Sequence, residues 1–217
     1  MDHEFLNDRR QRRFFLETLD CFRYIDKWDM GRSKDFADSF CTNQCVSKQH
    51  LIDCLNKTKS LRWQDTAGII GSWYGSILYP SLVANKITKI IGWDMDPWSK
   101  KISDHLFKKY WDHVYIENVV QDVWVEKPKS IDECNIIINT SCEHMPPMKY
   151  WNHFNYNSIY AFQSNNMFDV KDHINCVSSL DEFIDQMPGM MNIMHADEIE
   201  IESLDDGSKR FTIIASF

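Results

Sequence analysis

Hydrophobic positions in the first 60 residues recur every three or four places, which is the spacing of one face of an α-helix. Two such stripes stand out, one formed by Phe14, Phe15, Leu19 and Phe22 and the other by Val46, His50, Leu51, Cys54 and Leu55. We therefore predict an N-terminal helical segment over residues 1–60. Asn43 or Ser47 is expected to cap its second helix, and the polar run 56–60 is expected to end that helix.

The pattern changes near residue 65, where short apolar runs alternate with helix-like stretches. The runs expected to be buried strands are Ala67–Ile70, Ile87–Trp93, Val114–Val120, Ile136–Asn139 and Ile159–Phe162. The stretches expected to be helical are Ser76–Asn85, Pro97–Tyr110, Pro146–Phe154 and Leu180–Met187. This alternation predicts an α/β fold with a doubly wound, mostly parallel sheet over residues 61–217.

The C-terminal residues show a different pattern, in which two strand-like runs flank a tight-turn sequence. The runs are Glu198–Ser203 and Arg210–Phe217, and Asp205-Asp206-Gly207 lies between them. Two strands joined by so short a turn form an antiparallel hairpin. The sheet is therefore expected to end in such a hairpin, which is an uncommon addition to parallel strands.

Composition narrows the range of functions. The chain has 217 residues, 43% of them hydrophobic, and its 24 Lys and Arg against 32 Asp and Glu give a formal net charge of -8. Extended nucleic-acid binding is not expected, because the sign is opposite to that of proteins that track phosphates. The arginines at 9, 10, 12 and 13 could contact phosphate, but a solvated helix face is the favoured interpretation. We expect a small or locally docked polar substrate. Oligomeric state cannot be inferred.

The seven cysteines include no CxxC pair and no repeated spacing, which favours a reducing compartment over a disulfide framework. Cys41, Cys45 and Cys54 are the nearest approach to a metal-ligand cluster, yet buried cysteines usually pack as small apolar residues, and no metal is expected. The first residues lack an apolar signal core, and no run is long enough to span a membrane. We expect a soluble, cytoplasmic protein.

Three of the seven glycines lie close together, at Gly68, Gly71 and Gly75, where an apolar strand passes through a turn into a helix. Open α/β sheets bind ligands at such turns, because glycine lets the backbone approach a ligand closely. The spacing fits neither the GxGxxG dinucleotide pattern nor a P-loop.

Acidic residues follow the next two predicted strands. Asp94, 19 residues past Gly75, is placed to accept hydrogen bonds from ribose hydroxyls, and helix capping is the alternative. Asp96 suits that cap better, because Pro97 after it can occupy the first helical position. Asp122 after the third strand could accept the exocyclic amine of a base, or it could be an ordinary loop residue.

Together these features resemble the class I S-adenosylmethionine-dependent methyltransferases over residues 65–217. The resemblance implies a seven-stranded sheet and S-adenosylmethionine as cofactor, lying across the strand ends. It places Gly71 and Gly75 near the methionine part, Asp94 on the ribose and Asp122 at the adenine. Trp73 departs from the family, which has a small residue there. Trp73 or Tyr74 could face the sulfonium cation, or both could pack under the helical segment.

The segment after the fourth strand carries the candidate catalytic residues Asn139, Glu143 and His144. Family members that methylate amines have Asn/Asp-Pro-Pro-aromatic here, and only Asn139 matches, so a base amine is not implied as acceptor. Glu143 and His144 could act as general base or substrate anchor, or belong to a capped loop. Cys142 with His144 could suggest nucleophilic or metal chemistry, an alternative we do not favour.

The fifth strand ends at a neighbouring point of the same edge, so Gln163 and Asn165 are expected to join this polar rim, and His173 could be added to it. The resulting hypothesis is a methyltransferase that acts on an unidentified polar acceptor, covered by the helical segment. One alternative is another adenosylmethionine-using enzyme of this fold, with aminopropyl-type transfer or cofactor breakdown. Another is a catalytically silent binding module.

Overall fold

A computed structural model describes residues 9–59, 61–108, 113–201 and 207–217 of the chain. Within them, seven strands form one sheet in the order β3-β2-β1-β4-β5-β7-β6. The strands are β1 (Thr66–Ile70), β2 (Lys89–Asp94), β3 (Tyr115–Val120), β4 (Ile136–Asn139), β5 (Ile159–Asn165), β6 (Asn192–Glu200) and β7 (Lys209–Ser216). Strands β1 to β5 pair in parallel, and β7 pairs antiparallel with both β5 and β6. The expected seven-stranded α/β sheet with its C-terminal hairpin is confirmed.

The hairpin is longer than predicted, because β6 begins at Asn192 rather than at Glu198. None of its side chains is fully buried, and the alternation between exposed and half-buried positions is interrupted at residues 195–197, so periodicity marks this edge strand only weakly. The predicted turn residues Asp205 and Asp206, and the end of the first predicted run, lie outside the described residues.

Six α-helices and three 3₁₀ turns occupy the described part of the chain. The helices are α1 (Arg9–Asp26), α2 (Met30–Asp38), α3 (Thr42–Thr58), α4 (Leu78–Ala84), α5 (Pro97–Phe107) and α6 (Leu180–Ile184). The 3₁₀ turns are η2 (Ile131–Glu133), η3 (Cys142–His144) and η4 (Met148–Tyr150). The helical prediction for residues 1–60 is confirmed for the described part, whereas the division of the chain at residue 60 stays a prediction.

Two local predictions are wrong. Helix α3 begins at Thr42 with Cys41 as its N-cap residue, so Asn43 and Ser47 lie inside the helix, where the Ser47 hydroxyl donates to the Asn43 carbonyl. Residues 146–154 form only the 3₁₀ turn η4. Their two buried side chains are three residues apart, a spacing that suits a tight turn as well as a helix.

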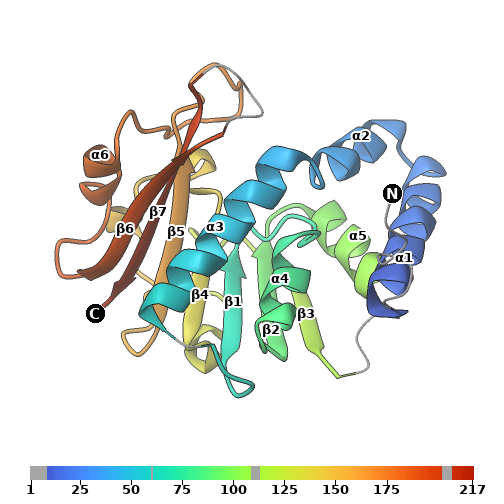
Figure 1. The fold of residues 1–217 in the computed structure, drawn as a ribbon, viewed down its shortest axis with the longest axis horizontal. Coiled ribbons are helices and arrows are strands. Elements are labelled where there is room, and N and C mark those ends of the chain that lie inside the picture. The colour runs from blue at the N-terminus through green and yellow to red at the C-terminus, as the bar shows by residue number, and fades with distance from the viewer. Residues whose placement is uncertain (1–8, 60, 109–112, 202–206) are drawn as a thin grey trace.

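The sheet separates two hydrophobic clusters. Helices α1 to α5 pack with one face of β1, β2 and β4, and Figure 1 shows α3 running diagonally across this face. The other face is covered by α6, the 3₁₀ turns and the loops between them. The N-terminal helices therefore share a core with the sheet, and they reach the carboxyl ends of its parallel strands.

Gly92 in β2 is a tightly enclosed position beside the glycine turn. A Cβ atom there would lie 2.0 Å from the Tyr79 hydroxyl oxygen and 2.8 Å from Ser72 Oγ, and Tyr79 donates to Asn118 in the core. We expect Gly92→Ala to lower the free energy of unfolding by about 1–3 kcal/mol through overpacking, measured by urea denaturation. Gly189→Ala is the control, because a Cβ there meets nothing within 4 Å. Equal stability of the two variants would contradict the prediction.

Candidate functional site

A cavity of about 840 Å³ lies at the carboxyl ends of the parallel strands. Its walls come from the turn after β1, the residues that follow β2, β3 and β4, the helices α2 and α3, and Arg210 of β7. This is the point where strand order reverses on the two sides of β1. The volume lies in the range of small-molecule sites, and the position is where open α/β sheets bind ligands.

The turn after β1 contains three residues with left-handed backbone conformation, Gly71 (φ 61°), Trp73 (φ 47°) and Gly75 (φ 66°). Glycine adopts this conformation freely, but for tryptophan it costs roughly 1–2 kcal/mol. The backbone N–H of Trp73 is held by Asp94 Oδ2 at 2.8 Å. A strained residue fixed by a carboxylate at a ligand-binding turn indicates that this conformation serves the site.

Asp94 ends β2 and connects the glycine turn with the segment that follows. Its Oδ2 accepts from Trp73, and its Oδ1 accepts from the backbone N–H of Asp96 at 2.9 Å. Burial raises the pKa of this carboxyl. The Ser99 hydroxyl also bonds this carboxylate, which is therefore held in place at the cavity and keeps acceptor capacity for a ligand hydroxyl.

Asp96 performs the capping role that was the alternative for Asp94. Its side chain accepts from the N–H of Trp98 at 2.9 Å, and Pro97 occupies the first turn of α5. Arg32 of α2 is paired with its other oxygen at 2.5 Å. The cap is therefore also the place where an N-terminal helix is fixed to the sheet.

Asp122 lines the cavity after β3, as expected, and its Oδ1 accepts from the N–H of Trp124 at 2.9 Å. The preceding Gln121 is buried and binds the backbone of Lys127 and Lys129. Gln121 therefore shapes the loop, whereas Asp122 has a second carboxylate oxygen available. Its contact with an adenine stays a prediction.

The two aromatic residues of the glycine turn, Trp73 and Tyr74, lie in different environments. Tyr74 is fully buried and packs edge-on against Phe36 of α2, at 5.7 Å between ring centroids. Trp73 stacks on Tyr74 at 5.0 Å and lines the cavity. Of the two aromatic residues considered for the sulfonium, Trp73 is the one that lines the cavity.

A buried polar corner occupies the cavity between η3 and β7. Oε1 of Glu143 accepts from Asn165 at 2.6 Å and from Arg210 Nη1 at 2.9 Å. The Arg210 and Glu143 side chains are only 4% and 5% exposed. Within the described residues Glu143 Oε2 and Arg210 Nε have no hydrogen-bond partner. Since buried polar atoms are rarely left unpaired, these two indicate a ligand position.

Lys48 of α3 also lines the cavity. Burial, and then the positive charge of Arg210, lower the pKa of Lys48 to about 7. Lys48 is therefore only partly protonated near neutral pH, and a bound anionic group would favour its charged form beside Arg210.

The contacts of Asn139 and Cys142 are those of structural rather than catalytic residues. Asn139 is fully buried and outside the cavity wall; its oxygen accepts from Ser141 at 2.9 Å and its amide faces the sulfur of Met145 at 3.3 Å. It shapes the loop that carries Glu143. The Cys142 thiol donates to the Asn139 carbonyl in the core, whereas His144 is exposed, so the two do not form a reactive pair.

His144 and His173 meet at the outer side of this corner, with ring centroids 4.6 Å apart. Nδ1 of each lies within 3.0 Å of a backbone carbonyl, and burial lowers the pKa of His173. Ligand atoms of both and of Glu143 lie within 4.8 Å of one another, close enough for a metal ion. The Arg210 guanidinium on Glu143 disfavours a cation here, so the histidines are better suited to hydrogen bonding and proton transfer.

The structure thus brings together Gly71, Trp73, Gly75, Asp94, Asp122, Glu143 and His144 around one cavity. Gln163 is buried behind it, where its amide donates to Ser47 of α3 and to Thr212. Sequence reasoning missed Lys48 and Arg210. A signal existed for Arg210, which is a charged residue that leads directly into the apolar part of β7, but Lys48 resembles any surface lysine of a helix.

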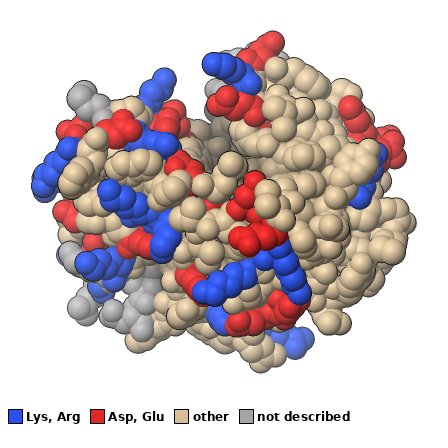
Figure 2. All heavy atoms as spheres, turned by 180° about the vertical axis from the view of Figure 1, so that it is seen from behind, with Lys and Arg blue, Asp and Glu red and all other residues tan. Residues whose placement is uncertain are grey.

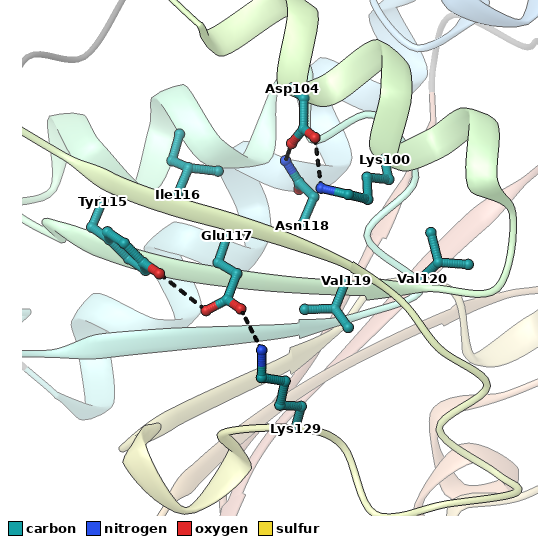
Figure 3. A pocket seen from close by; sticks show the side chains of 9 residues that line it. All are labelled: Lys100, Asp104, Tyr115, Ile116, Glu117, Asn118, Val119, Val120 and Lys129. Atoms are coloured by element: carbon teal, nitrogen blue, oxygen red, sulfur yellow. Dashed lines mark hydrogen bonds and ion pairs between the residues drawn. The ribbon is translucent and has the colours of Figure 1, made fainter.

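A second hollow, of about 470 Å³, follows the outer edge of the sheet along β3. Figure 3 shows that its charged residues face one another: Lys100 bonds Asp104, and Lys129 bonds Glu117. Charged side chains are a common protection of an edge strand against pairing with another chain. This hollow therefore protects a sheet edge, and we assign no ligand to it.

Comparison with known proteins supports the fold. No protein-family model and no curated protein matches the sequence. Among solved structures, geranyl diphosphate C-methyltransferase from Streptomyces coelicolor A3(2), with Mg²⁺, geranyl diphosphate and S-adenosyl-L-homocysteine, has a TM-score of 0.57 at 12% identity, over 78% of this chain and 77% of that one. An S-adenosylmethionine-dependent methyltransferase from Clostridium acetobutylicum has 0.55 at 11%, over 79% and 90%.

A variant of MtNAS in complex with S-adenosylmethionine matches more of the chain, with a TM-score of 0.59 at 8% identity over 92% of this chain and 71% of that one. At these identities the likeness concerns the fold alone. The fold is that of the class I S-adenosylmethionine-dependent methyltransferases, as the sequence pattern predicts.

Proposed function

We propose that this chain, which has the class I methyltransferase fold, binds S-adenosylmethionine across the ends of β1 to β4 and transfers its methyl group to a small polar acceptor. The observation that carries the proposal is Asp94, whose carboxylate lines the cavity and holds the strained turn at Trp73. The neighbours that were crystallised with S-adenosylmethionine or S-adenosyl-L-homocysteine support the same cofactor.

The residues present fit this cofactor. The carboxylate of Asp94 keeps acceptor capacity for the ribose, and Gly71 and Gly75 give the turn its left-handed backbone beside the place proposed for the methionine part. Asp122 also lines the cavity, and we assign it to the adenine. When bound, S-adenosylmethionine supplies an electrophilic methyl group; the chain has to hold and align the two reactants and exclude water.

The acceptor belongs in the corner of Glu143, Arg210 and Lys48. An unpaired carboxylate oxygen and an unpaired guanidinium nitrogen suit an acceptor that carries both a donor and an anionic group. Glu143 or His144 can take up the proton that an attacking hydroxyl or amine loses. Asn139 acts through the loop that positions Glu143.

A small acceptor is supported by the volume of the cavity and by the surface charge. Figure 2 shows Lys and Arg interspersed with Asp and Glu on the face seen from behind, without a continuous basic stripe. In the N-terminal cluster, Arg12 is exposed on α1, and the side chains of Arg9 and Arg10 lie outside the described residues.

None of the described helices has the length and apolar character needed to cross a bilayer. All seven cysteines are unpaired, which supports a cytoplasmic setting.

The test is calorimetric titration with S-adenosylmethionine, followed by incubation with methyl-labelled cofactor and fractionated cell extract. We expect binding, label in a small-molecule fraction and S-adenosylhomocysteine as the spent cofactor. Methylthioadenosine would instead show aminopropyl-type transfer or cofactor breakdown. Binding without any turnover would favour a silent binding module, and absence of binding would remove the proposal.

Trp73 provides a prediction about the sulfonium. A cation over an indole face gains roughly 0.5–2 kcal/mol. We expect Trp73→Leu to weaken binding of S-adenosylmethionine by about 3- to 30-fold, while S-adenosylhomocysteine, which lacks the positive charge, changes much less. Leucine carries the same backbone strain as tryptophan, so the difference between the two ligands isolates the charge. Equal loss for both ligands in calorimetry would assign Trp73 to packing.

A further inference from the structure

A second cluster of ligating side chains lies away from the cavity, between α3 and β6. His50 and Cys54 are four residues apart on α3, and His195 and Asp197 are two residues apart on β6. These spacings place each pair on one face of its element. Long-range contacts confirm that the faces meet, since His50 Nε2 lies 3.4 Å from Asp197 Oδ2.

The distances in the cluster are those of metal ligands. Sγ of Cys54 lies 3.5 Å from Nε2 of His50, and one ligand atom from each of His50, Cys54 and Asp197 lies within 4.8 Å of the others. In a tetrahedral zinc site with bonds of about 2.3 Å to sulfur and 2.0 Å to nitrogen and oxygen, neighbouring ligand atoms are about 3.3–3.6 Å apart. The two measured separations from His50 Nε2, 3.4 and 3.5 Å, agree with this geometry.

Hydrogen bonding explains the same arrangement poorly. The thiol of Cys54 and the carboxylate of Asp197 both converge on Nε2 of His50, which offers one proton or one lone pair. Nδ1 of His50 lies 3.1 Å from the Thr212 hydroxyl, which also accepts from Gln163. When Nδ1–H is donated to Thr212, Nε2 presents its lone pair to the Cys54 and Asp197 side, as in histidines that bind metals.

His195 is the candidate for a fourth ligand: it neighbours Asp197 on β6, but its ring nitrogens lie outside the 4.8 Å group of the other three residues and would have to turn toward it. Its Nε2 is buried, has no hydrogen-bond partner within the described residues, and lies 3.8 Å from Asp197 Oδ2. A buried imidazole nitrogen without a partner is unfavourable, and a metal ion would satisfy it.

We propose that His50, Cys54, His195 and Asp197 bind one zinc ion that fastens α3 to β6. The donor set of one thiolate, two imidazoles and one carboxylate suits zinc rather than magnesium or calcium. Binding releases the thiol proton of Cys54, and the thiolate and carboxylate then balance the two positive charges of the ion. Lys57, which faces Asp197 at 3.4 Å and is 55% exposed, can turn into solvent.

The site differs from the cysteine cluster that the sequence suggests. Cys41 and Cys45 are exposed near the start of α3, and Cys45 is nine residues, or about 13 Å of helix, from Cys54. Because α3 also carries Lys48 into the cavity wall, zinc would hold a wall of the proposed methyl-transfer site in place. The zinc proposal does not depend on that activity.

The experiment uses the full chain, purified under reducing conditions, freed of metal with a chelator, and titrated with Co²⁺ as a spectroscopic probe and with Zn²⁺. We expect one ion per chain, a thiolate-to-cobalt absorption band, and a Tm raised by roughly 5 °C with zinc. Cys54→Ser should remove the band and weaken zinc binding about 100-fold or more, since it deletes a ligand. Cys45→Ser, an exposed thiol on the same helix, should keep both.

Asp197→Asn provides a second variant if Cys54→Ser does not fold, because Asp197 is 39% exposed and its change should be tolerated. It should also weaken zinc binding. The proposal is overturned if the wild-type chain shows no thiolate-to-cobalt band, or if the band is unchanged in Cys54→Ser or lost equally in Cys45→Ser.

Discussion

Asp94→Ala should reduce the affinity for S-adenosylmethionine by at least about 100-fold. The substitution removes two charge-assisted hydrogen bonds to the ribose, each of roughly 1.5–3 kcal/mol. It also releases the N–H groups of Trp73 and Asp96 that the carboxylate holds. Isothermal titration calorimetry measures the effect, with circular dichroism to show that the variant is folded.

Asp96→Asn is the matched control for this loop. It removes a charge two residues away and weakens the pair with Arg32, but keeps a side chain that caps α5 equally well. We expect its affinity to stay within about threefold of the wild type, a change of less than 1 kcal/mol. Similar losses in both variants would mean that the negative charge of the loop matters and that Asp94 has no special place in the site.

The pH dependence gives an independent check on Asp94. The carboxylate has to be ionised to accept two hydroxyl donors, and burial raises its pKa above the usual value of 3.8. Affinity should therefore fall as pH decreases through this raised pKa, beginning at a higher pH than an exposed aspartate would give. Asp94→Asn should lack this acidic decrease. An unchanged decrease would assign it to another group.

Arg210→Met should lower the free energy of unfolding by about 3–5 kcal/mol, because it leaves the buried carboxylate of Glu143 without its ion-pair partner. Urea denaturation measures this loss. The double variant Arg210→Met with Glu143→Gln should recover much of the stability, since it removes the uncompensated charge together with its partner. Additive losses in the double variant would contradict coupling between the two side chains.

The same double variant separates acceptor binding from cofactor binding. The acceptor corner is lost, while Asp94 and the glycine turn are unchanged. We therefore expect normal affinity for S-adenosylmethionine and a loss of methyl transfer of about 100-fold or more, if the pair contributes roughly 3 kcal/mol to holding the acceptor. Wild-type turnover in this variant would exclude the corner from acceptor binding.

Much of the fold could be predicted, because the signals are local. Apolar runs mark the five parallel strands, and the Asp96-Pro97 pair marks the start of α5. The errors are also local. The apolar pattern of residues 146–154 does not distinguish a helix from a 3₁₀ turn. The polar residues near the start of α3 do not distinguish a cap from an interior position. At residues 146–154 a contact distant in sequence, from the Lys149 N–H to the Gln186 carbonyl, holds the turn.

Only part of the site could be predicted from the sequence: residues that directly follow a strand could be placed, whereas residues brought together by contacts distant in sequence could not. Asp94 and the glycine turn each follow a strand, so their positions at the sheet edge could be inferred from the strand pattern. Arg210 could not be inferred in this way, because its partner Glu143 is 67 residues away and comes from a different type of element. Lys48 lacks any local mark and gains its place only through the packing of α3 on the sheet.

By itself, the sequence determined which segments form strands and helices and which acids end the strands, because helical and strand periodicities are properties of neighbouring residues. Only the tertiary structure decided that Lys48, Glu143 and Arg210 share one corner and that His50, 162 residues before Thr212, meets β6 and β7. The physical reason is that such contacts depend on strand order and helix packing. These are set by burial of the whole core rather than by any local pattern.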